Sequence, residues 1–339
     1  MGNKKLHIAI IGVGTMGRRW ARVAHDTEGC EVLYLVDADS EKANAVGVTL
    51  SDTMRVTNRL EDALNDAAVD AVVIATPHAF LAKISYQALV AGKHVLCEKP
   101  GGINVGEIKK ALDVALQKNL RYMIAFNHRF HPAMWHAKEL VDKGGIGKIL
   151  FIRGRYGHGG RPGYNKEWRA SEEMSGGGEL LDQGVHLIDL ARWFLGDFDT
   201  VEGILTTNFW NIKPLEDNAF LTLKNSDDQV AHLHASWTQW KRLFSWEVYG
   251  DKGYVSVEGL GGKYGSETLT VGRRDDKFDV IEERKIFENP ARRDPDDSLY
   301  NVWGEFVSAI RERREPRPSG CDALLALEVI EAIYNKHAL

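Results

Sequence analysis

The first 127 residues alternate between short hydrophobic runs and longer stretches with helical periodicity. Runs such as HIAIIGV and AVVIATP contain almost no polar positions, and helical stretches such as MGRRWARVAHD lie between them. Strands without polar alternation are typical of a parallel sheet that is buried on both faces, with the helices as crossovers. The pattern therefore predicts a doubly wound α/β domain over residues 1–127.

The pattern changes in the second half of the chain. Segments such as KILFIRGRYGH and QVAHLHASW alternate hydrophobic and polar positions, with the turns NSDD and GDKG among them, and two helical patterns close the chain. Such alternation is typical of an antiparallel sheet with one packed face and one open face. We expect an α/β domain over residues 128–339 with a large, mostly antiparallel, open-faced sheet. Trp210, Trp237, Trp246 and Tyr249 would suit a dimer interface on the open face, but packing in the core explains them equally well.

Composition and charge narrow the classes of function. A length of 339 residues suits two domains, and a net charge of -5 leaves no basic surface for nucleic acid. No apolar stretch approaches the roughly 20 residues that a membrane span requires. Cys30, Cys97 and Cys321 are too widely spaced for a disulfide framework or a metal site, so we expect a cytoplasmic protein without a metal.

A dinucleotide fingerprint follows the first predicted strand. GVGTMG places Gly12, Gly14 and Gly17 at the spacing that permits a tight turn, approach to a pyrophosphate and close packing of helix on strand. Asp37 ends the second predicted strand, where a carboxylate binds the adenosine ribose hydroxyls and repels a 2′-phosphate. The pattern predicts bound NAD, in preference to NADP.

Two further motifs carry reactive side chains. In CEKPGG, Lys99 follows a predicted parallel strand, at the edge of the sheet where doubly wound folds bind ligands, although a solvated loop lysine would look the same. In SGGGELLDQGVHLIDLARWF, an α-helix would place Asp182 and His186 on one face, because four residues advance about 400°. A buried histidine bonded to a backbone carbonyl is the structural alternative for His186.

Together these motifs resemble a known family. The glycine turn, TPHAF, GKHVLCEKP, NHRFHP, GGIGKI, EWR and GGGELLDQGVHLIDL occur in the order seen in the glucose-fructose oxidoreductase, inositol dehydrogenase and MocA family. The resemblance implies an amino-terminal Rossmann domain and a carboxy-terminal domain whose open sheet forms homodimers or homotetramers. It also implies that Lys99, before a proline in a cis peptide, faces the substrate and that Asp182 and His186 complete the catalytic group.

The resemblance implies hydride transfer between a nicotinamide cofactor and a hydroxyl or keto carbon of a sugar or cyclic polyol. His186 would act as general base, Asp182 would orient it or hold a neighbouring hydroxyl, and Lys99 would polarise the reacting oxygen. His78 stands where members often have asparagine, and Leu81 stands where they have histidine, which leaves the ribose contacts of this loop open. The remaining cofactor-binding candidates are Thr15, Met16, Thr76, Pro77, His78, Glu98, Lys99 and Asn127.

The substrate is predicted less sharply. RGRYGHGGRPGYNKEWR contains four arginines, which hold carboxylates and phosphates in bidentate fashion, so the sugar could carry a uronate or a nucleotide diphosphate. Pairing of these arginines with nearby acids is the alternative. The predicted substrate-binding residues are Lys99, Arg155, Tyr156, Trp168, Arg169, Asp182 and His186.

Two rival functions remain open. Some members of the family are glycosidases that use transient oxidation with bound NAD, and others are non-catalytic regulators that bind the dinucleotide. Lys99, Asp182 and His186 count against the regulator, because a regulator does not require them.

Overall fold

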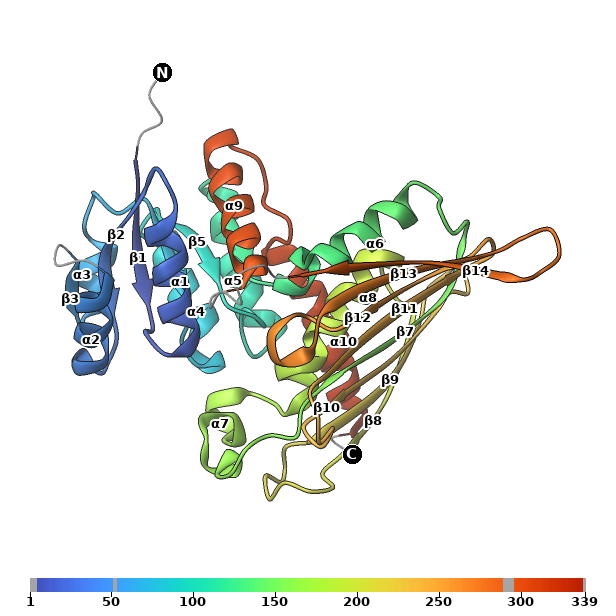
Figure 1. The fold of residues 1–339 in the computed structure, drawn as a ribbon. Helices are drawn as coiled ribbons and strands as arrows, with labels where there is room; N and C mark the ends of the chain where they lie inside the picture. The colour runs from blue at the N-terminus through green and yellow to red at the C-terminus, as the bar shows by residue number, and fades with distance from the viewer. Residues whose placement is uncertain (1–4, 51–53, 289–295, 338–339) are drawn as a thin grey trace. The chain divides into compact units, whose positions relative to one another are not determined.

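A computed structural model describes the chain except for residues 1–4, 51–53, 289–295 and 338–339 (Figure 1). Its internal contacts divide the chain into two compact units. The first unit comprises Met1–Phe126 and Leu299–Leu325, and the second comprises Asn127–Ser298 and Ala326–Leu339.

The first unit contains a six-stranded parallel sheet in the order β3-β2-β1-β4-β5-β6, which is the classical dinucleotide-binding order. Its hydrophobic runs are buried on both faces as expected, with Ile8, Ile10, Val72 and Leu96 fully buried. The strands are β1 (Leu6–Ile11), β2 (Cys30–Val36), β3 (Arg55–Thr57), β4 (Ala71–Ile74), β5 (His94–Cys97) and β6 (Tyr122–Ile124).

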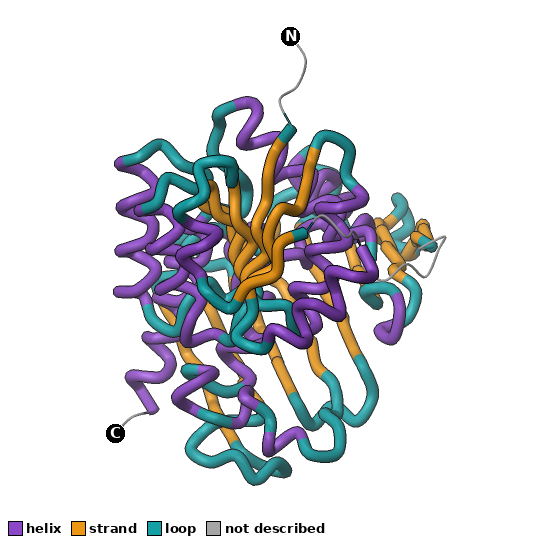
Figure 2. The backbone as a smooth tube through the Cα atoms, turned by 90° about the vertical axis from the view of Figure 1, so that its left-hand side faces the viewer, coloured by secondary structure: helices purple, strands orange, loops and turns teal. Residues whose placement is uncertain are grey.

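Helices cover both faces of this parallel sheet (Figure 2). Helix α1 begins directly after the glycine turn, and its buried Trp20 donates from Nε1 to Glu98 Oε1 at the end of β5, 2.7 Å away. The helices are α1 (Thr15–Asp26), α2 (Ser40–Leu50), α3 (Leu60–Leu64), α4 (His78–Val90) and α5 (Val105–Gln117).

The chain closes with two helices, α9 (Asp297–Glu312) and α10 (Gly320–His337), which do not both lie wholly in the second unit. The prediction places both in the second domain, whereas residues 299–325 pack with the first unit. Trp303 is buried beside Cys30, and Ser319 forms a bridge to Met123 in β6. These contacts join segments far apart in the sequence, which a linear division of the chain cannot represent.

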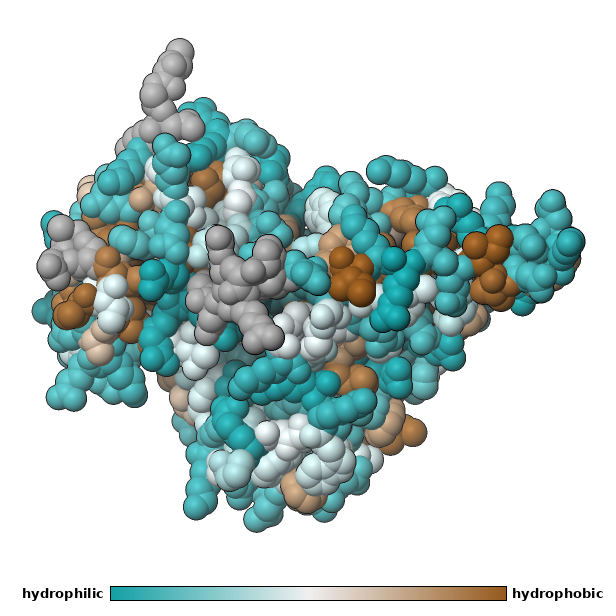
Figure 3. Space-filling view, viewed as in Figure 1, coloured by the Kyte–Doolittle hydropathy of each residue, from teal (hydrophilic) through white to brown (hydrophobic). Residues whose placement is uncertain are grey.

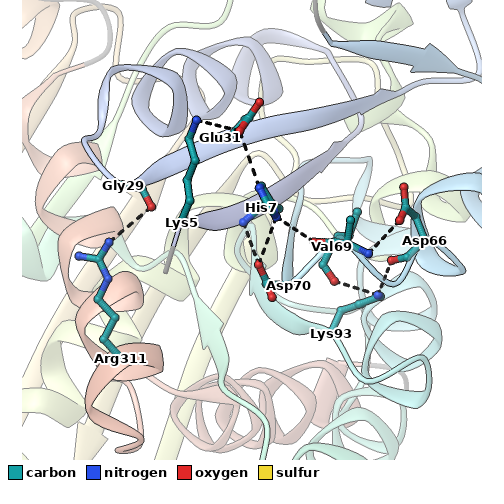
Figure 4. Close-up of polar contacts among 10 residues, drawn as sticks. Lys5, His7, Gly29, Glu31, Asp66, Val69, Asp70, Lys93 and Arg311 are labelled. Atoms are coloured by element: carbon teal, nitrogen blue, oxygen red, sulfur yellow. Dashed lines mark hydrogen bonds and ion pairs between the residues drawn. The ribbon is translucent and has the colours of Figure 1, made fainter. Parts of the chain in front are cut away.

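The amino-terminal ends of the parallel strands carry a network of polar contacts (Figure 4). The backbone N–H of His7 donates to Asp70 Oδ2, and Lys93 Nζ donates to the carbonyl oxygens of Asp66 and Val69 at 2.8 Å each. Burial lowers the pKa of Lys93, and the nearby carboxylates of Asp66 and Asp70 oppose the shift. Because the glycine turn follows the opposite end of β1, this network stabilises the sheet away from the cofactor edge.

The second unit contains an eight-stranded sheet in the order β14-β13-β12-β11-β7-β10-β9-β8. All its neighbours are antiparallel except β7 and β10, so the expectation of a mostly antiparallel sheet is confirmed. The strands are β7 (Ile149–Gly157), β8 (Thr200–Thr206), β9 (Asn218–Lys224), β10 (Val230–Ser236), β11 (Leu243–Gly250), β12 (Tyr254–Glu258), β13 (Glu267–Arg274) and β14 (Val280–Phe287).

One face of this sheet packs against helices, among them α6 (Pro132–Asp142) and α8 (Val185–Leu195) (Figure 1). The opposite face presents Phe151, stacked on Tyr249 with ring centroids 4.8 Å apart. Of the two explanations for the tryptophans, core packing holds for Trp237 and Trp246, which are fully buried. Residue alternation does not say which face of a strand is the inner one, so only the packing decides.

Exposed hydrophobic residues form small separate patches among hydrophilic ones on the face shown in Figure 3. In the part of the chain that the structure describes, no helix is long and apolar enough to cross a membrane.

Candidate active site

The glycine turn between β1 and α1 uses its three glycines in different ways. Gly12 has φ +84°, and a Cβ there would lie 2.7 Å from the Ala75 carbonyl oxygen, while a Cβ at Gly17 would overlap the Gly12 oxygen. A Cβ at Gly14 would meet no protein atom within 4 Å. Gly14 is also the N-cap of α1 and provides no side-chain cap, so this helix end suits an anion such as a pyrophosphate.

Asp37 braces this turn. Its Oδ2 accepts from the Val13 N–H at 2.6 Å and its Oδ1 accepts from the Asp39 N–H at 2.9 Å. Since each carboxylate oxygen has two lone pairs, both keep acceptor capacity toward ribose hydroxyls. Thr15 lies exposed and Met16 half-buried in the first turn of α1, beside Gly14.

The ends of β4 and β5 carry the other cofactor candidates of the first unit. Thr76 is half-buried, and its Oγ1 is a buried oxygen without a hydrogen-bond partner in the described chain, beside the glycine turn. Pro77 precedes His78, which is buried at the first position of α4. The Lys99–Pro100 peptide is cis, as the resemblance implies, and Lys99 is half-buried. Together with the open space before Gly14, these residues fit a dinucleotide.

The three glycines before the catalytic segment are explained by protein contacts. Gly176 has φ +75°. A Cβ at Gly177 would overlap Tyr334 Oη, and one at Gly178 would overlap the backbone of Glu216. Close approach of a ligand is therefore not needed to explain Gly177 and Gly178, because Tyr334 and Glu216 already fill the space.

The segment that carries Asp182 and His186 begins as a π-helical turn, Leu180–Gly184, and continues as α8. The expected regular α-helix is therefore wrong at Asp182, because a π turn contains one more residue per hydrogen-bonded ring. Glu216 supports the turn, since its Oε1 accepts from the Leu180 N–H and from Tyr334 Oη at 2.9 Å each. Burial raises the pKa of Glu216, and these hydrogen bonds oppose the shift.

Asp182 is 1% exposed and forms an ion pair with Arg169, whose Nε lies 3.0 Å from Asp182 Oδ2. The Arg169 guanidinium lies 4.3 Å from the centre of the Trp168 ring. The structure therefore brings three of the predicted substrate-binding residues together. Burial opposes the charge on Arg169, but Asp182, Tyr164 and Glu167 together outweigh it and raise the pKa of Arg169.

His186 stacks on a second histidine that the motif search did not single out as a functional residue. The ring centroids of His186 and His128 are 3.9 Å apart, the planes differ by 21°, and both residues are buried. The neighbouring Arg129 binds Asp189 in bidentate fashion, at 2.8 and 2.6 Å. Because Asp189 lies three residues after His186, this ion pair fixes His128 against the His186 ring.

Further aromatic and polar residues enclose this stack. Tyr156 contacts His128 edge-on at 4.7 Å and His186 at 6.0 Å, and its hydroxyl bonds to Tyr264. Burial raises the pKa of Tyr156, so the phenol remains a neutral donor. His131 Nδ1 lies 2.8 Å from Glu267 Oε1 and anchors the same short segment.

His158 is a second residue that the sequence did not identify. Burial lowers the pKa of His158 to about 4. The Asp182 carboxylate would raise this pKa, but the nearby arginines offset part of its effect. Its Nδ1 accepts from the Gly160 N–H at 2.9 Å, which leaves Nε2 as the N–H donor of a neutral ring. The two glycines that follow it are the signal that could have drawn attention to this position.

The arginines of the segment 153–169 are paired within the protein. Arg161 binds Glu167 in bidentate fashion at 2.7 and 2.6 Å, and Arg153 Nε lies 2.7 Å from Glu247 Oε2. Arg155 donates to Ser245 Oγ at 3.3 Å on the face of β7 opposite to Tyr156, so it does not join the Asp182 group. The alternative of pairing with nearby acids thus describes Arg153, Arg161 and Arg169, but not Arg155.

The other candidates are placed as follows. Glu98 is buried against Trp20, and Asn127 Nδ2 donates to Ser298 Oγ at 3.0 Å. Among the described residues, no group of three or more His, Cys, Asp or Glu side chains could hold a metal ion.

Comparisons with known proteins match both halves of the chain. Residues 6–126 match the oxidoreductase family with an NAD-binding Rossmann fold, and residues 134–256 match the GFO/IDH/MocA C-terminal domain. The D-xylose 1-dehydrogenase [NADP(+)] of Haloarcula marismortui is 32% identical over 343 residues, which cover 97% of this chain and 90% of that protein.

Levoglucosan dehydrogenase gives a shorter match in sequence and a complete one in structure. The protein from Pseudarthrobacter phenanthrenivorans is 40% identical over 138 residues, so this chain spans only 35% of that relative. A solved levoglucosan dehydrogenase in complex with NADH and L-sorbose has a TM-score of 0.87 at 24% identity, covering 98% of this chain and 97% of that one. The latter match shows the shared fold.

Proposed function

This chain belongs to the GFO/IDH/MocA oxidoreductase family, and from this premise we propose that it oxidises or reduces one hydroxyl-bearing carbon of a neutral sugar or cyclic polyol. The observation that carries the choice of substrate is the pairing of Arg161 and Arg169 with protein carboxylates, while Arg153 lies with Arg155 on the opposite face of β7 from Tyr156. Since the charges of Arg161 and Arg169 are already compensated, the group around Asp182 suits a polyhydroxy compound better than a uronate or a nucleotide sugar.

The first unit would hold the cofactor through the α1 N-terminus, Asp37 and Thr76. The nicotinamide, when bound, supplies the hydride acceptor or donor. His186 takes the hydroxyl proton when the alcohol is oxidised and returns it when the ketone is reduced. Lys99 polarises the reacting oxygen.

The second unit would orient the sugar. We assign Asp182 to a neighbouring hydroxyl, because Arg169 holds the carboxylate in place through Oδ2. His158 is a neutral donor for a further hydroxyl, and the Tyr156 oxygen, whose O–H is engaged with Tyr264, is an acceptor. His128 positions His186 by ring stacking. Arg155 is left out of this site because of its place on the opposite face of β7.

NAD is the proposed cofactor because Asp37 ends β2 with acceptor capacity toward a ribose, although the Haloarcula relative is named for NADP(+). An Asp37→Ala substitution should lower the NAD over NADP preference in kcat/KM roughly tenfold. An unchanged preference would remove Asp37 from cofactor selection.

Two further assignments remain proposals. We assign the Phe151 and Tyr249 face of the large sheet to a homodimer or homotetramer, which light scattering of the purified protein would test. We also propose a cytoplasmic location from the wide spacing of the cysteines.

The function is tested by NADH absorbance when purified protein is mixed with NAD or NADP and a panel of neutral sugars, inositols, uronates and nucleotide sugars. Turnover with neutral sugars above the anionic ones supports the proposal, and a preference for anionic substrates contradicts it. Glycoside cleavage that requires only catalytic amounts of NAD would identify the glycosidase instead. Cofactor binding without any turnover would favour the regulator.

A further inference from the structure

Two exposed aromatic residues lie together in loops of the second unit. Phe209 is 54% exposed and Trp240 is 72% exposed, and their ring centroids are 4.9 Å apart at 78°. Trp240 has φ +52°, which a bulky side chain rarely adopts. The exposed rings of Phe209 and Trp240 are called the aromatic pair below.

A buried carboxylate holds the loop that carries Phe209. Asp217 is fully buried, and its two oxygens accept from the backbone N–H groups of Asn208, Phe209 and Trp210 at 2.8–2.9 Å. Burial opposes the charge, but these hydrogen bonds outweigh it and lower the pKa of Asp217. These hydrogen bonds restrain the loop. A ligand that binds to it therefore loses little free energy to ordering of the chain.

A small hydrophobic cluster supports the aromatic pair from beneath. Trp210 packs on Tyr164 with centroids 5.4 Å apart, and its Nε1 donates to the Trp237 carbonyl oxygen at 3.0 Å. Tyr164 and Trp237 belong to the cluster, and Phe209 contacts Trp210 edge-on at 5.2 Å. The exposed rings are therefore the outer end of a continuous aromatic column.

The inner end of this column reaches the proposed substrate residues. Tyr164 contacts His158 edge-on at 5.8 Å, and Asp182 lies close enough to affect the pKa of both residues. The two residues after His158 are glycines: a Cβ at Gly159 would lie 3.1 Å from Trp240 Cα, and one at Gly160 would overlap the Trp210 ring. Both aromatic loops therefore contact the backbone that carries His158.

The size of the aromatic pair limits its occupant. Two aromatic side chains present at most about 400 Å², whereas a stable protein interface buries about 800 Å² per partner. No other exposed large hydrophobic residue lies in the described segments 157–170, 207–217 and 237–242. The face of a pyranose ring, with its slightly positive C–H groups, matches one aromatic face in size and charge.

We propose that the aromatic pair is a subsite for a second sugar ring, linked to the sugar that reacts beside Asp182 and His158. The inference rests on the proposed function and deepens it: the substrate class is a disaccharide or a comparable glycoside. Trp240 provides the stacking face, and Phe209 holds the Trp240 ring.

The test compares substrates that differ only in the second ring. The kcat/KM of wild type is measured for methyl β-D-glucoside against cellobiose and for methyl α-D-glucoside against maltose. We expect the disaccharide to be preferred in at least one pair, and W240A to reduce that preference about five- to tenfold without changing kcat/KM for the methyl glucoside. W240F should retain most of the preference, and F209A should lose part of it.

Phe278 supplies a matched control, because it is also aromatic, 74% exposed and in a left-handed conformation (φ +67°). F278A should leave the preference unchanged. The proposal is overturned if wild type shows no preference for a disaccharide, if W240A and F278A behave alike, or if W240A slows both substrates equally. A change of molecular mass in W240A by light scattering would also overturn it, because the aromatic pair would then contact another copy of the chain.

If no sugar is turned over, the proposed function fails. The subsite is then tested by disaccharide binding instead of turnover. Calorimetric titration of cellobiose and maltose into the protein with NADH should then show binding that W240A weakens and F278A does not. No difference between wild type and W240A would reject the subsite.

Discussion

Two glycine-rich turns precede helices in this protein, and their glycines serve opposite purposes. In GVGTMG, Gly14 faces open space, so a ligand is able to approach the backbone there. In SGGG, Gly177 and Gly178 face Tyr334 and Glu216, so the protein itself occupies the space. The first turn is suited to binding, and the second holds the segment that carries Asp182 and His186.

The comparison teaches that glycine spacing reports close approach without identifying what approaches. In the second turn, protein atoms oppose a Cβ at Gly177 and Gly178, whereas in the first turn they oppose one at Gly12 and Gly17 and leave the space at Gly14 open. The two turns should therefore respond differently to substitution.

The largest expected effect concerns the segment that the second turn holds. H186A should lower kcat about 10²- to 10⁴-fold with NADH affinity unchanged, because a general base is removed while the first turn is intact. Steady-state kinetics and fluorescence titration of NADH measure the two effects. H136A, at an exposed histidine, is the control. Turnover within threefold of wild type would exclude His186 as the base.

G178A should destabilise the protein by about 3 kcal/mol, since its Cβ would overlap the Glu216 backbone. Urea unfolding followed by circular dichroism measures this loss. G304A, in the middle of α9 with open space around it, should be at least as stable as wild type and up to about 1 kcal/mol more stable, because alanine favours the helix. If the two variants unfolded alike, the explanation of the second turn by packing would be wrong.

G14A should do the reverse. No protein atom opposes its Cβ and φ is −69°, so the free energy of unfolding should stay within about 0.5 kcal/mol of wild type. NADH affinity should fall about tenfold or more, because the methyl group separates the backbone from the pyrophosphate. Unchanged affinity would contradict the role of this turn as the cofactor site.

H128A should lower kcat about tenfold and leave the KM for sugar within about threefold, because a loosely held His186 ring is misplaced while the substrate contacts remain. H128F restores a flat ring and should recover most of kcat. An equal loss of kcat in both variants, or a higher KM with unchanged kcat, would reject positioning by stacking.

The smallest effect concerns one half-buried histidine in each unit. Burial lowers the pKa of His94 and of His158 to about 4. Because the unfolded chain binds these protons near pH 6.5 and the folded chain does not, the stability that each contributes is lost as pH falls from 6.5 toward 4.

The free energy of unfolding of wild type should therefore fall between pH 7.5 and pH 5.5. In His94→Gln this fall should be about 1 kcal/mol smaller, a value discounted for the partial exposure of the ring. Urea unfolding at both pH values measures this. His158→Gln should show a similar reduction and also raise the KM for sugar, whereas His94→Gln should not. An unchanged pH dependence in both variants would mean that these rings are protonated in the folded protein.

Some of the site could be predicted because its signals are local. Gly12, Gly14, Gly17 and Asp37 lie within one βαβ unit, so their spacing alone places them near one another. His128 lies 58 residues before His186, and no spacing rule relates them. The stack forms in the folded protein, where the Arg129–Asp189 ion pair and the Tyr156 and Phe244 rings hold His128 beside His186.

The sequence by itself determined the two kinds of sheet, the glycine turn after the first strand and the order of the motifs. These features depend on the hydrophobic pattern and the backbone geometry of residues that are neighbours in the chain. Only the tertiary structure decided that Trp237 and Trp246 face the core, that the segment at Asp182 is a π turn and that the arginines are compensated. These features depend on contacts between residues far apart in the chain, whose partners are chosen by packing and charge after the elements have come together.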